Sequence, residues 1–155
     1  MTGTSRSCAQ VLAVLIAASS VSALAADIGQ LKVAKGLVTI ERSGQAIPAA
    51  VGTRVQAGDI VRTAANASVG ITMIDETLLS AGPNSMLVLD RLDYDASTRS
   101  GRLDATLGTG TLAVVSGRIA KQSPEAMTLR TPLAVLGVRG TEFAVSAHDP
   151  VLARP

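Results

Sequence analysis

The stretch that decides the fold is Thr-Pro-Leu-Ala-Val-Leu-Gly-Val-Arg-Gly-Thr-Glu-Phe, which runs from Thr131 to Phe143. Pro132 has no amide hydrogen to donate to a neighbouring strand, so it suits the first position or the edge of a strand. Gly137 and Gly140 permit backbone conformations that residues with a β-carbon avoid. We therefore predict a strand interrupted by a bulge or turn between these two glycines.

A single positive charge, Arg139, lies between the two glycines. We interpret it as a structural residue whose guanidinium group satisfies loop carbonyls or pairs with Glu142, because that group carries five donors in a fixed geometry. The alternative interpretation is that Arg139 contacts a partner protein or a carboxylate. Both interpretations stay open on the sequence.

Outward from this stretch, apolar and polar residues alternate in short runs. Val69, Ile71 and Met73 alternate with Gly70 and Thr72, which is typical of a half-buried strand. Such runs recur roughly every 8–12 residues with Gly, Pro, Asn and Asp between them, and no amphipathic helix is predicted after residue 26. The pattern predicts an all-β fold of short antiparallel strands, in a sandwich or in a stacked-hairpin, solenoid-like arrangement. The solenoid is the second choice because no strict repeat can be aligned.

Two details of this pattern concern glycines near the middle of the chain. We interpret Gly108-Thr109-Gly110 as a break between strands. The following segments, Leu112–Val115 and Gly117–Ala120, are predicted as further strand.

A second motif, Val55-Gln-Ala-Gly-Asp-Ile-Val-Arg-Thr63, lies earlier in the chain. Its Gly58-Asp59 pair predicts a tight turn, in which the glycine takes unusual backbone angles and the aspartate accepts hydrogen bonds from nearby amides. This motif resembles the Gly-Asp-x-Ile-x-Thr element of the FecR-type periplasmic domain, and the Thr131–Phe143 stretch resembles that family's signature. The resemblance extends from about Gly36 to Val145.

The resemblance implies an exported, non-enzymatic module for protein interaction or signal sensing at a bacterial cell envelope. In the iron-transport regulators of this family, the domain lies between an inner-membrane anti-sigma segment and an outer-membrane receptor. An envelope protein is therefore the expected partner, and neither a cofactor nor a metal is expected. The family-signature and candidate interaction residues are Gly58, Asp59, Gly137, Arg139, Gly140, Thr141 and Phe143.

Family members usually continue past the Gly-Thr-x-Phe element with a further hairpin, whereas this sequence ends soon after it. We therefore expect an open sheet edge, in a natural short form or in a truncated one. Two other function classes remain as alternatives. One is a cell-envelope scaffold or wall-polymer-binding module, and the other is a small envelope hydrolase.

Composition argues against nucleic acid as a partner. Fourteen Lys and Arg residues against twelve Asp and Glu give a net charge of +2, and the arginines are scattered among acids. A nucleic-acid-binding surface normally needs a concentrated basic patch. With one Tyr, one Phe and no Trp, the chain also lacks the aromatic side chains on which bases stack.

Groups that could perform catalysis or bind metal are sparse. The only histidine, His148, falls in a predicted tail, which disfavours a Ser–His–Asp triad. The acidic pair Asp75-Glu76 lies at a predicted turn, where carboxylates are commonly solvated, and a second acidic cluster of Asp90, Asp93 and Asp95 is interpreted in the same way. The segment around Asp93 and Asp95 lacks the glycine and the final glutamate of a calcium-binding loop.

The first 25 residues are predicted to form a signal helix. Arg6 supplies positive charge, the segment from Val11 to Ala18 is apolar, and Ala23-Leu24-Ala25 matches a cleavage site. We therefore divide the chain into a signal peptide (1–25), a FecR-like all-β domain (26–146) and a loose C-terminal tail (147–155), and we expect a periplasmic or secreted protein. An uncleaved membrane anchor is the alternative. Cleavage would remove Cys8, the only cysteine.

Export is testable directly. When the full chain is expressed in a bacterium with a general secretion pathway, mass spectrometry is expected to find a mature chain that begins at Ala26, within a residue or two. A membrane-embedded product that retains Met1 would establish the anchored alternative instead.

Overall fold

The computed structural model describes residues 25–139 and 142–148, and most of these residues lie in strands. The strands are β1 (Asp27–Lys35), β2 (Val38–Arg42), β3 (Gln45–Pro48), β4 (Arg54–Gln56), β5 (Ile60–Thr63), β6 (Ser68–Met73), β7 (Leu78–Ala81), β8 (Met86–Asp95), β9 (Ser100–Val115), β10 (Met127–Arg130), β11 (Val135–Gly137) and β12 (Glu142–Ala147). Two short helical segments, α1 (Arg118–Gln122) and η1 (Pro124–Ala126), connect β9 to β10. The predicted all-β fold is confirmed.

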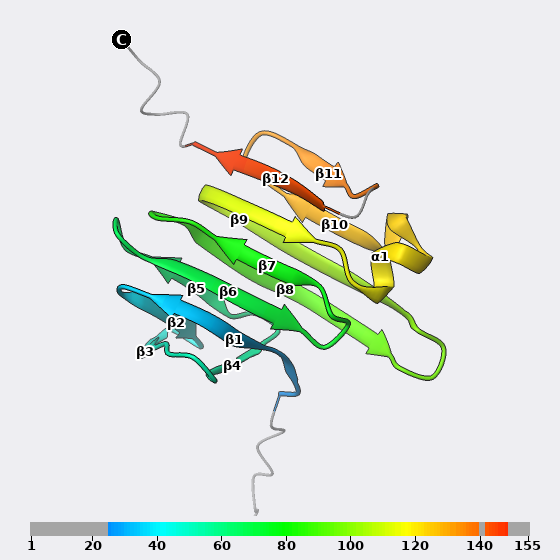
Figure 1. Ribbon diagram of the computed structural model, residues 1–155, viewed down its shortest axis with the longest axis horizontal. Helices are drawn as coiled ribbons and strands as arrows, with labels where there is room; N and C mark the ends of the chain where they lie inside the picture. The colour runs from blue at the N-terminus through cyan, green and yellow to red at the C-terminus, as the bar shows by residue number, and fades with distance from the viewer. Residues whose placement is uncertain (1–24, 140–141, 149–155) are drawn as a thin grey trace, which may run out of the picture.

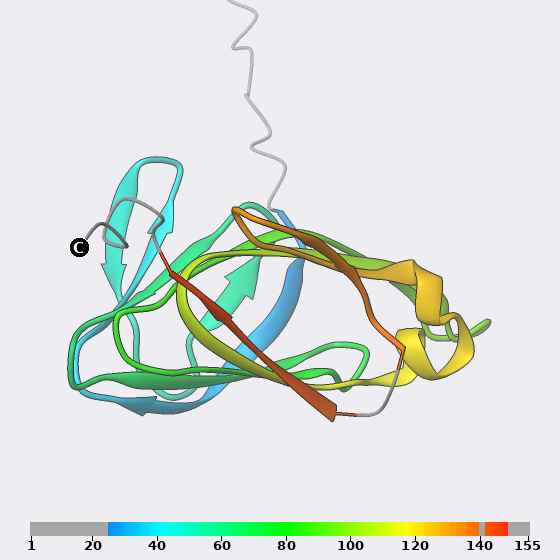
Figure 2. The ribbon, with the colours of Figure 1, turned by 90° about the horizontal axis from the view of Figure 1, so that it is seen from above.

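The strands belong to one sheet that turns along its longest strand, β9 (Figure 1). The first part of β9 pairs with β8, and the part from Leu112 to Val115 pairs with β7. The strands β10 and β12 also pair with β9, β10 in parallel and β12 antiparallel. Figure 2 shows the sheet curling so that two walls face each other. These walls correspond to the layers of the predicted sandwich, but they are continuous through β9.

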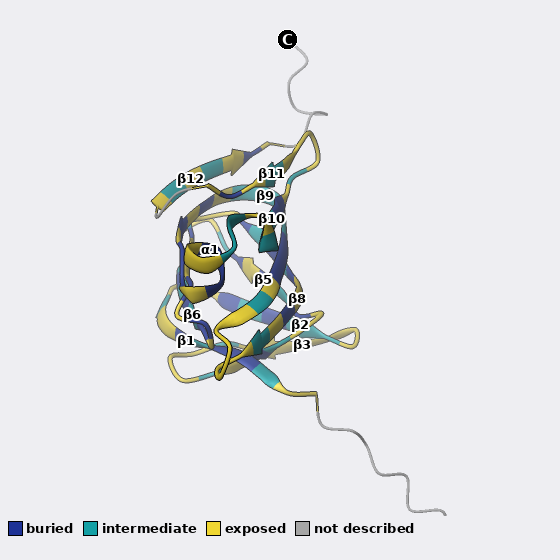
Figure 3. Cartoon of the chain, turned by 90° about the vertical axis from the view of Figure 1, so that its right-hand side faces the viewer, coloured by how far each residue is buried: buried dark blue, intermediate teal, exposed yellow. Residues whose placement is uncertain are grey.

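The interior between the walls is filled by aliphatic side chains. Val69, Ile71 and Met73 of β6 are buried as their alternation predicts, whereas Gly70 and Thr72 are only half-buried. Leucine and isoleucine dominate the largest fully buried side chains. Figure 3 shows the short helix α1 at one end of the curled sheet, where two of its residues are buried. Burial of aliphatic surface is therefore the main stabilising contribution in this fold.

A hydrogen-bonded cluster fixes the point at which β9 changes neighbours. The Ser85 hydroxyl accepts from the Thr111 amide at 3.1 Å and lies 3.2 Å from the Thr111 carbonyl. The Ser85 amide donates to Thr63 Oγ1 at 2.9 Å, and the Thr63 hydroxyl donates to the Gly82 carbonyl at 2.7 Å. Gly110 has a φ of 91°, and a β-carbon there would overlap Ser85. Both the backbone angle and the close approach therefore require glycine.

The prediction of strand at Gly117–Ala120 is wrong, because α1 begins at Arg118. The amides of Gly117 and Arg118 donate hydrogen bonds to the turn that follows β6. Gly117 donates to Thr77 Oγ1 at 3.1 Å, and the Arg118 amide donates to the Asp75 carbonyl at 2.8 Å. With these amides occupied by the turn, the chain leaves the sheet after Val115.

The predicted break at Gly108-Thr109-Gly110 is also wrong, since β9 continues through it from Ser100 to Val115. The glycines mark the place where the strand changes partners. Glycine within a strand often marks a bend or a close backbone approach, and Gly110 shows both features.

Some predictions fall on segments that the structure does not describe. The signal helix is among them, and so is the tail from residue 149 onward. Ala147 forms the last residue of β12, so the strand runs one residue past the domain boundary that we predicted. Within residues 25–139 and 142–148, no helix has the length and apolar character needed to cross a membrane.

The bend in β9 gives a stability prediction. Replacing Gly110 with alanine is expected to lower the free energy of unfolding by about 1–2 kcal/mol for the positive φ, and by about 1–3 kcal/mol more for the overlap with Ser85. The control is Gly44→Ala, where φ is 77° and no atom lies within 4 Å of the added carbon. Equal losses in urea unfolding would show that the contact with Ser85 does not matter.

Candidate functional site

The signature stretch supplies the turn and the second strand of the β10–β11 hairpin and the first residues of β12. The strands β10 and β11 are joined by a tight turn, in which the Thr131 amide donates to the Ala134 carbonyl at 2.8 Å. The Ala134 amide donates to Thr131 Oγ1 at 3.1 Å. Pro132 and Leu133 occupy the two central positions of the turn, where Pro132 fixes its own φ. The turn therefore holds Leu133 at the tip of the hairpin.

Apolar side chains at this end of the molecule are exposed to solvent. Leu133 is 79% exposed and Val135 is 67% exposed, which are high values for aliphatic side chains in the described part of the chain. Beside them, Leu136 and Val145 are half-buried and line a pocket of about 280 Å³ between the hairpin and β12. We call the β10–β11 hairpin, β12 and this pocket the hairpin site.

Two strand edges lie open at the hairpin site. Among the described strands, β11 pairs with β10 alone, and β12 pairs with β9 alone. Each therefore presents one row of backbone amides and carbonyls that no other described strand satisfies. This agrees with the open sheet edge expected from the sequence. An edge of this kind can pair with another chain.

The structure changes the interpretation of the glycines in the signature. Gly137 ends β11 without a positive φ, and a β-carbon built on it meets no atom within 4 Å. The predicted requirement for glycine at this position is therefore wrong. Gly140 and Thr141 lie outside the described residues, so the predicted bulge at Gly140 stays a prediction.

Arg139 is exposed and forms no hydrogen bond or ion pair with any other residue that the structure describes. Its proposed pairing with Glu142 is absent from the ion pairs of these residues. Phe143, another signature residue, is half-buried in β12 and packs against the core. The pairing of Arg139 with Glu142 is thus not found among the described residues, and because Gly140 and Thr141 lie outside them, both interpretations of Arg139 stay predictions.

The Gly58-Asp59 pair has a structural role. Gly58 has a φ of 88°, and the Asp59 amide donates to the Gln56 carbonyl at 3.2 Å, so the predicted tight turn is confirmed. The Asp59 side chain is only 1% exposed. Its carboxylate accepts from the Gln56 amide at 2.8 Å and from Arg42 at 2.8 Å and 2.7 Å. The turn therefore buries a carboxylate with a full set of donors.

The partner of this carboxylate was not predicted from the sequence. Arg42 ends β2, far from Asp59 along the chain, and no local pattern indicates the pairing. The two-pronged contact raises the pKa of Arg42, chiefly through the hydrogen bond to Asp59. Because breaking a buried pair leaves an uncompensated charge, this interaction holds β2 against the β4–β5 turn.

The two motifs do not come together in space. Figure 1 shows β4, which leads into the Gly58-Asp59 turn, at the opposite end of the molecule from β11 and β12. The Val55–Thr63 motif is thus separate from the hairpin site, where residues of the signature stretch reach solvent.

The carboxylate pair at residues 75 and 76 is divided between two environments. Asp75 is fully buried, so the prediction that it is solvated is wrong, and it accepts from the Thr77 amide at 3.1 Å and from the Thr77 hydroxyl at 2.7 Å. Glu76 is exposed and pairs with Arg118. His148 is exposed beside the pocket of the hairpin site. Across the described ranges, no cluster of three His, Cys, Asp or Glu side chains is placed to hold a metal.

Comparison with known proteins agrees with this description. The family model for FecR protein matches residues 59–153, which is more than half of the chain. The chain therefore belongs to the FecR family, and membership suggests a domain related to signalling and its regulation. The match begins at Asp59 and includes the whole signature stretch. No curated protein and no solved structure matches the chain.

The buried pair predicts unequal effects of two arginine substitutions. Arg42→Met removes the charge that compensates Asp59 and is expected to lower the free energy of unfolding by about 3 kcal/mol. The control is Arg54→Met, which removes the exposed pair with Asp27 and is expected to change stability little. Both are measured by chemical denaturation. Equal effects would contradict the anchoring role of Asp59.

Proposed function

We propose that this FecR-family protein is an exported, non-enzymatic module of the bacterial periplasm that binds an envelope protein through the hairpin site. Binding there would couple the partner to a signalling or regulatory response, as expected for a domain of this family. The observation that carries the proposal is the exposure of Leu133 and Val135 beside two open strand edges.

The energetics of exposure support a binding role for these side chains. An aliphatic side chain that moves from water into a protein interface contributes about 1.5–3 kcal/mol. Leu133 and Val135 are adjacent to a pocket lined by Leu136 and Val145, so a partner can cover all of them at once. Arg139 follows β11 at the end of the hairpin away from Leu133, and within the described residues its side chain has no ion pair, so it can add a contact to a partner carboxylate.

The proposal is tested by cross-linking in the periplasm. A photoreactive amino acid at position 133 is expected to give a covalent adduct with an envelope protein. The control position is Leu37, which is 67% exposed in the segment between β1 and β2. Adduct formation at 133 but not at 37 supports the hairpin site, whereas equal adducts at both positions contradict it.

A substitution completes the test. Leu133→Glu is expected to abolish the adduct formed by a second photoreactive residue at position 135, because it places a charge in an apolar contact. Its melting temperature is expected to stay that of the parent, since Leu133 is largely exposed. Leu37→Glu is the matched control, and it is expected to change neither the adduct nor the melting temperature.

A further inference from the structure

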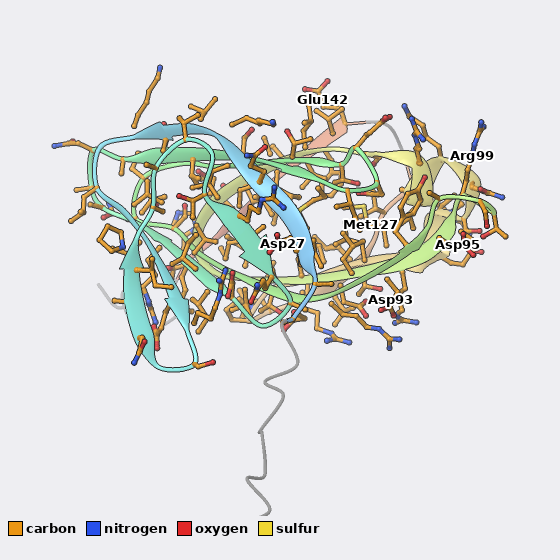
Figure 4. The ribbon with its side chains drawn as sticks, turned by 90° about the horizontal axis from the view of Figure 1, so that it is seen from below. Asp27, Asp93, Asp95, Arg99, Met127 and Glu142 are labelled. Atoms are coloured by element: carbon orange, nitrogen blue, oxygen red, sulfur yellow. The ribbon has the colours of Figure 1, made fainter. Side chains whose placement is uncertain are left out.

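A second surface, formed by the β8–β9 turn and α1, gathers positive side chains around a pocket. Arg99 lies in the turn between β8 and β9, and Arg118, Lys121 and Gln122 lie in α1. Together these four residues line a pocket of about 320 Å³. Figure 4 shows Arg99 at the tip of the β8–β9 hairpin, near Asp95. We call this the basic pocket.

Most acids near the basic pocket are already engaged. Asp95 accepts hydrogen bonds from the Ser97 amide and hydroxyl, and Glu76 pairs with Arg118. Within the described part of the chain, the side chains of Arg99 and Lys121 form no ion pair or hydrogen bond. Three positive side chains line the pocket, and two carboxylates lie close to it: Glu76, which pairs with Arg118, and Asp95, which accepts its hydrogen bonds from Ser97 and Thr98. The surface therefore keeps an excess of positive charge, with Arg99 and Lys121 outside the ion pairs of the described residues.

The backbone at Arg99 is unusual for this residue type. Its φ is 56°, in the left-handed region that glycine and asparagine occupy readily and that other residues reach at a cost. Glycine would satisfy the same turn with less strain. A residue that is locally unfavourable for the fold and that presents a free charge to a pocket is a candidate for function.

We propose that the basic pocket binds the phosphate group of an anionic ligand. A terminal phosphate carries up to two negative charges and three acceptor oxygens, which suit the side chains of Arg99 and Lys121 and the guanidinium of Arg118. Arginine forks bind phosphate oxygens in pairs, and lysine contributes a point charge. The same chemistry occurs in free phosphate and in a lipid headgroup, so the test must separate these two sources.

The first arm uses inorganic phosphate with the purified protein, followed by amide and side-chain NMR at low ionic strength, with chloride at equal ionic strength as reference. Saturable shifts are expected at Arg99 and Lys121. Lys121→Gln is expected to weaken phosphate binding about tenfold, as loss of one charge-assisted hydrogen bond does. The control Lys35→Gln, which removes an exposed charge on β1, is expected to leave binding unchanged.

Arg99→Gly separates binding from stability. Because glycine relieves the left-handed strain, this variant is expected to melt at a higher temperature than the parent and to bind phosphate about tenfold more weakly. A higher melting temperature with unchanged phosphate affinity would overturn the proposal. Absence of saturable shifts in the parent protein, or equal shifts with chloride, would overturn it as well.

The second arm separates the two sources of phosphate by flotation with vesicles of phosphatidic acid, whose headgroup is a terminal phosphate, in phosphatidylcholine. Flotation that Lys121→Gln abolishes identifies a lipid headgroup, and phosphate binding without flotation identifies a soluble ligand. The inference does not depend on the hairpin site. Leu133→Glu is expected to leave phosphate binding unchanged, so failure of either proposal is seen separately.

Discussion

The continuous hydrogen bonding of β9 is the constraint on which the rest of the structure depends. This strand of sixteen residues pairs with β7, β8, β10 and β12, so both walls of the curled sheet are attached to it. The change of partners takes place beside Gly110, where Ser85 approaches too closely for any β-carbon. The hairpin site is built on the same strand, because β10 and β12 reach the sheet only through β9. Correct pairing of β9 therefore positions the core and the hairpin site together.

Buried polar groups explain why the Val55–Thr63 motif has its particular residues. The fully buried side chains of the core are aliphatic, and a buried polar group without a partner costs free energy, so most buried polar groups are hydrogen-bonded. Asp59 finds Arg42 and the Gln56 amide, and Thr63 joins the hydrogen-bonded cluster around Ser85. In this chain the motif reads Gly58-Asp-Ile-Val-Arg-Thr63. Asp59 directly precedes β5 and Thr63 ends it, so the two polar residues hold both ends of this short strand. Asp59 and Thr63 are buried and serve the fold, whereas Arg62 of the same motif is exposed.

Local patterns predicted the strands well and the long-range contacts poorly. The alternation in β6 and the Gly58-Asp59 turn were correct because both depend on neighbours in the sequence. The helix α1 was missed because the Asp75–Thr77 turn, distant along the chain, captures the amides of Gly117 and Arg118. The partner of Asp59 and the basic pocket were missed for the same reason. The requirement for glycine at Gly137 was inferred from residue type alone, and only the backbone angle could test it.

The open edges at the hairpin site constrain how a partner can bind. Natural sheets protect such edges by short strands, proline and charge, and all three occur here: β11 has three residues, Pro132 precedes it, and Glu142 begins β12. These features disfavour indiscriminate pairing of backbone edges. They leave Leu133 and Val135 uncovered, so the apolar side chains rather than the backbone offer the larger gain to a partner. Recognition through the side chains of the hairpin is consequently the mode that this surface favours, with the strand edges setting the orientation of whatever segment it contacts.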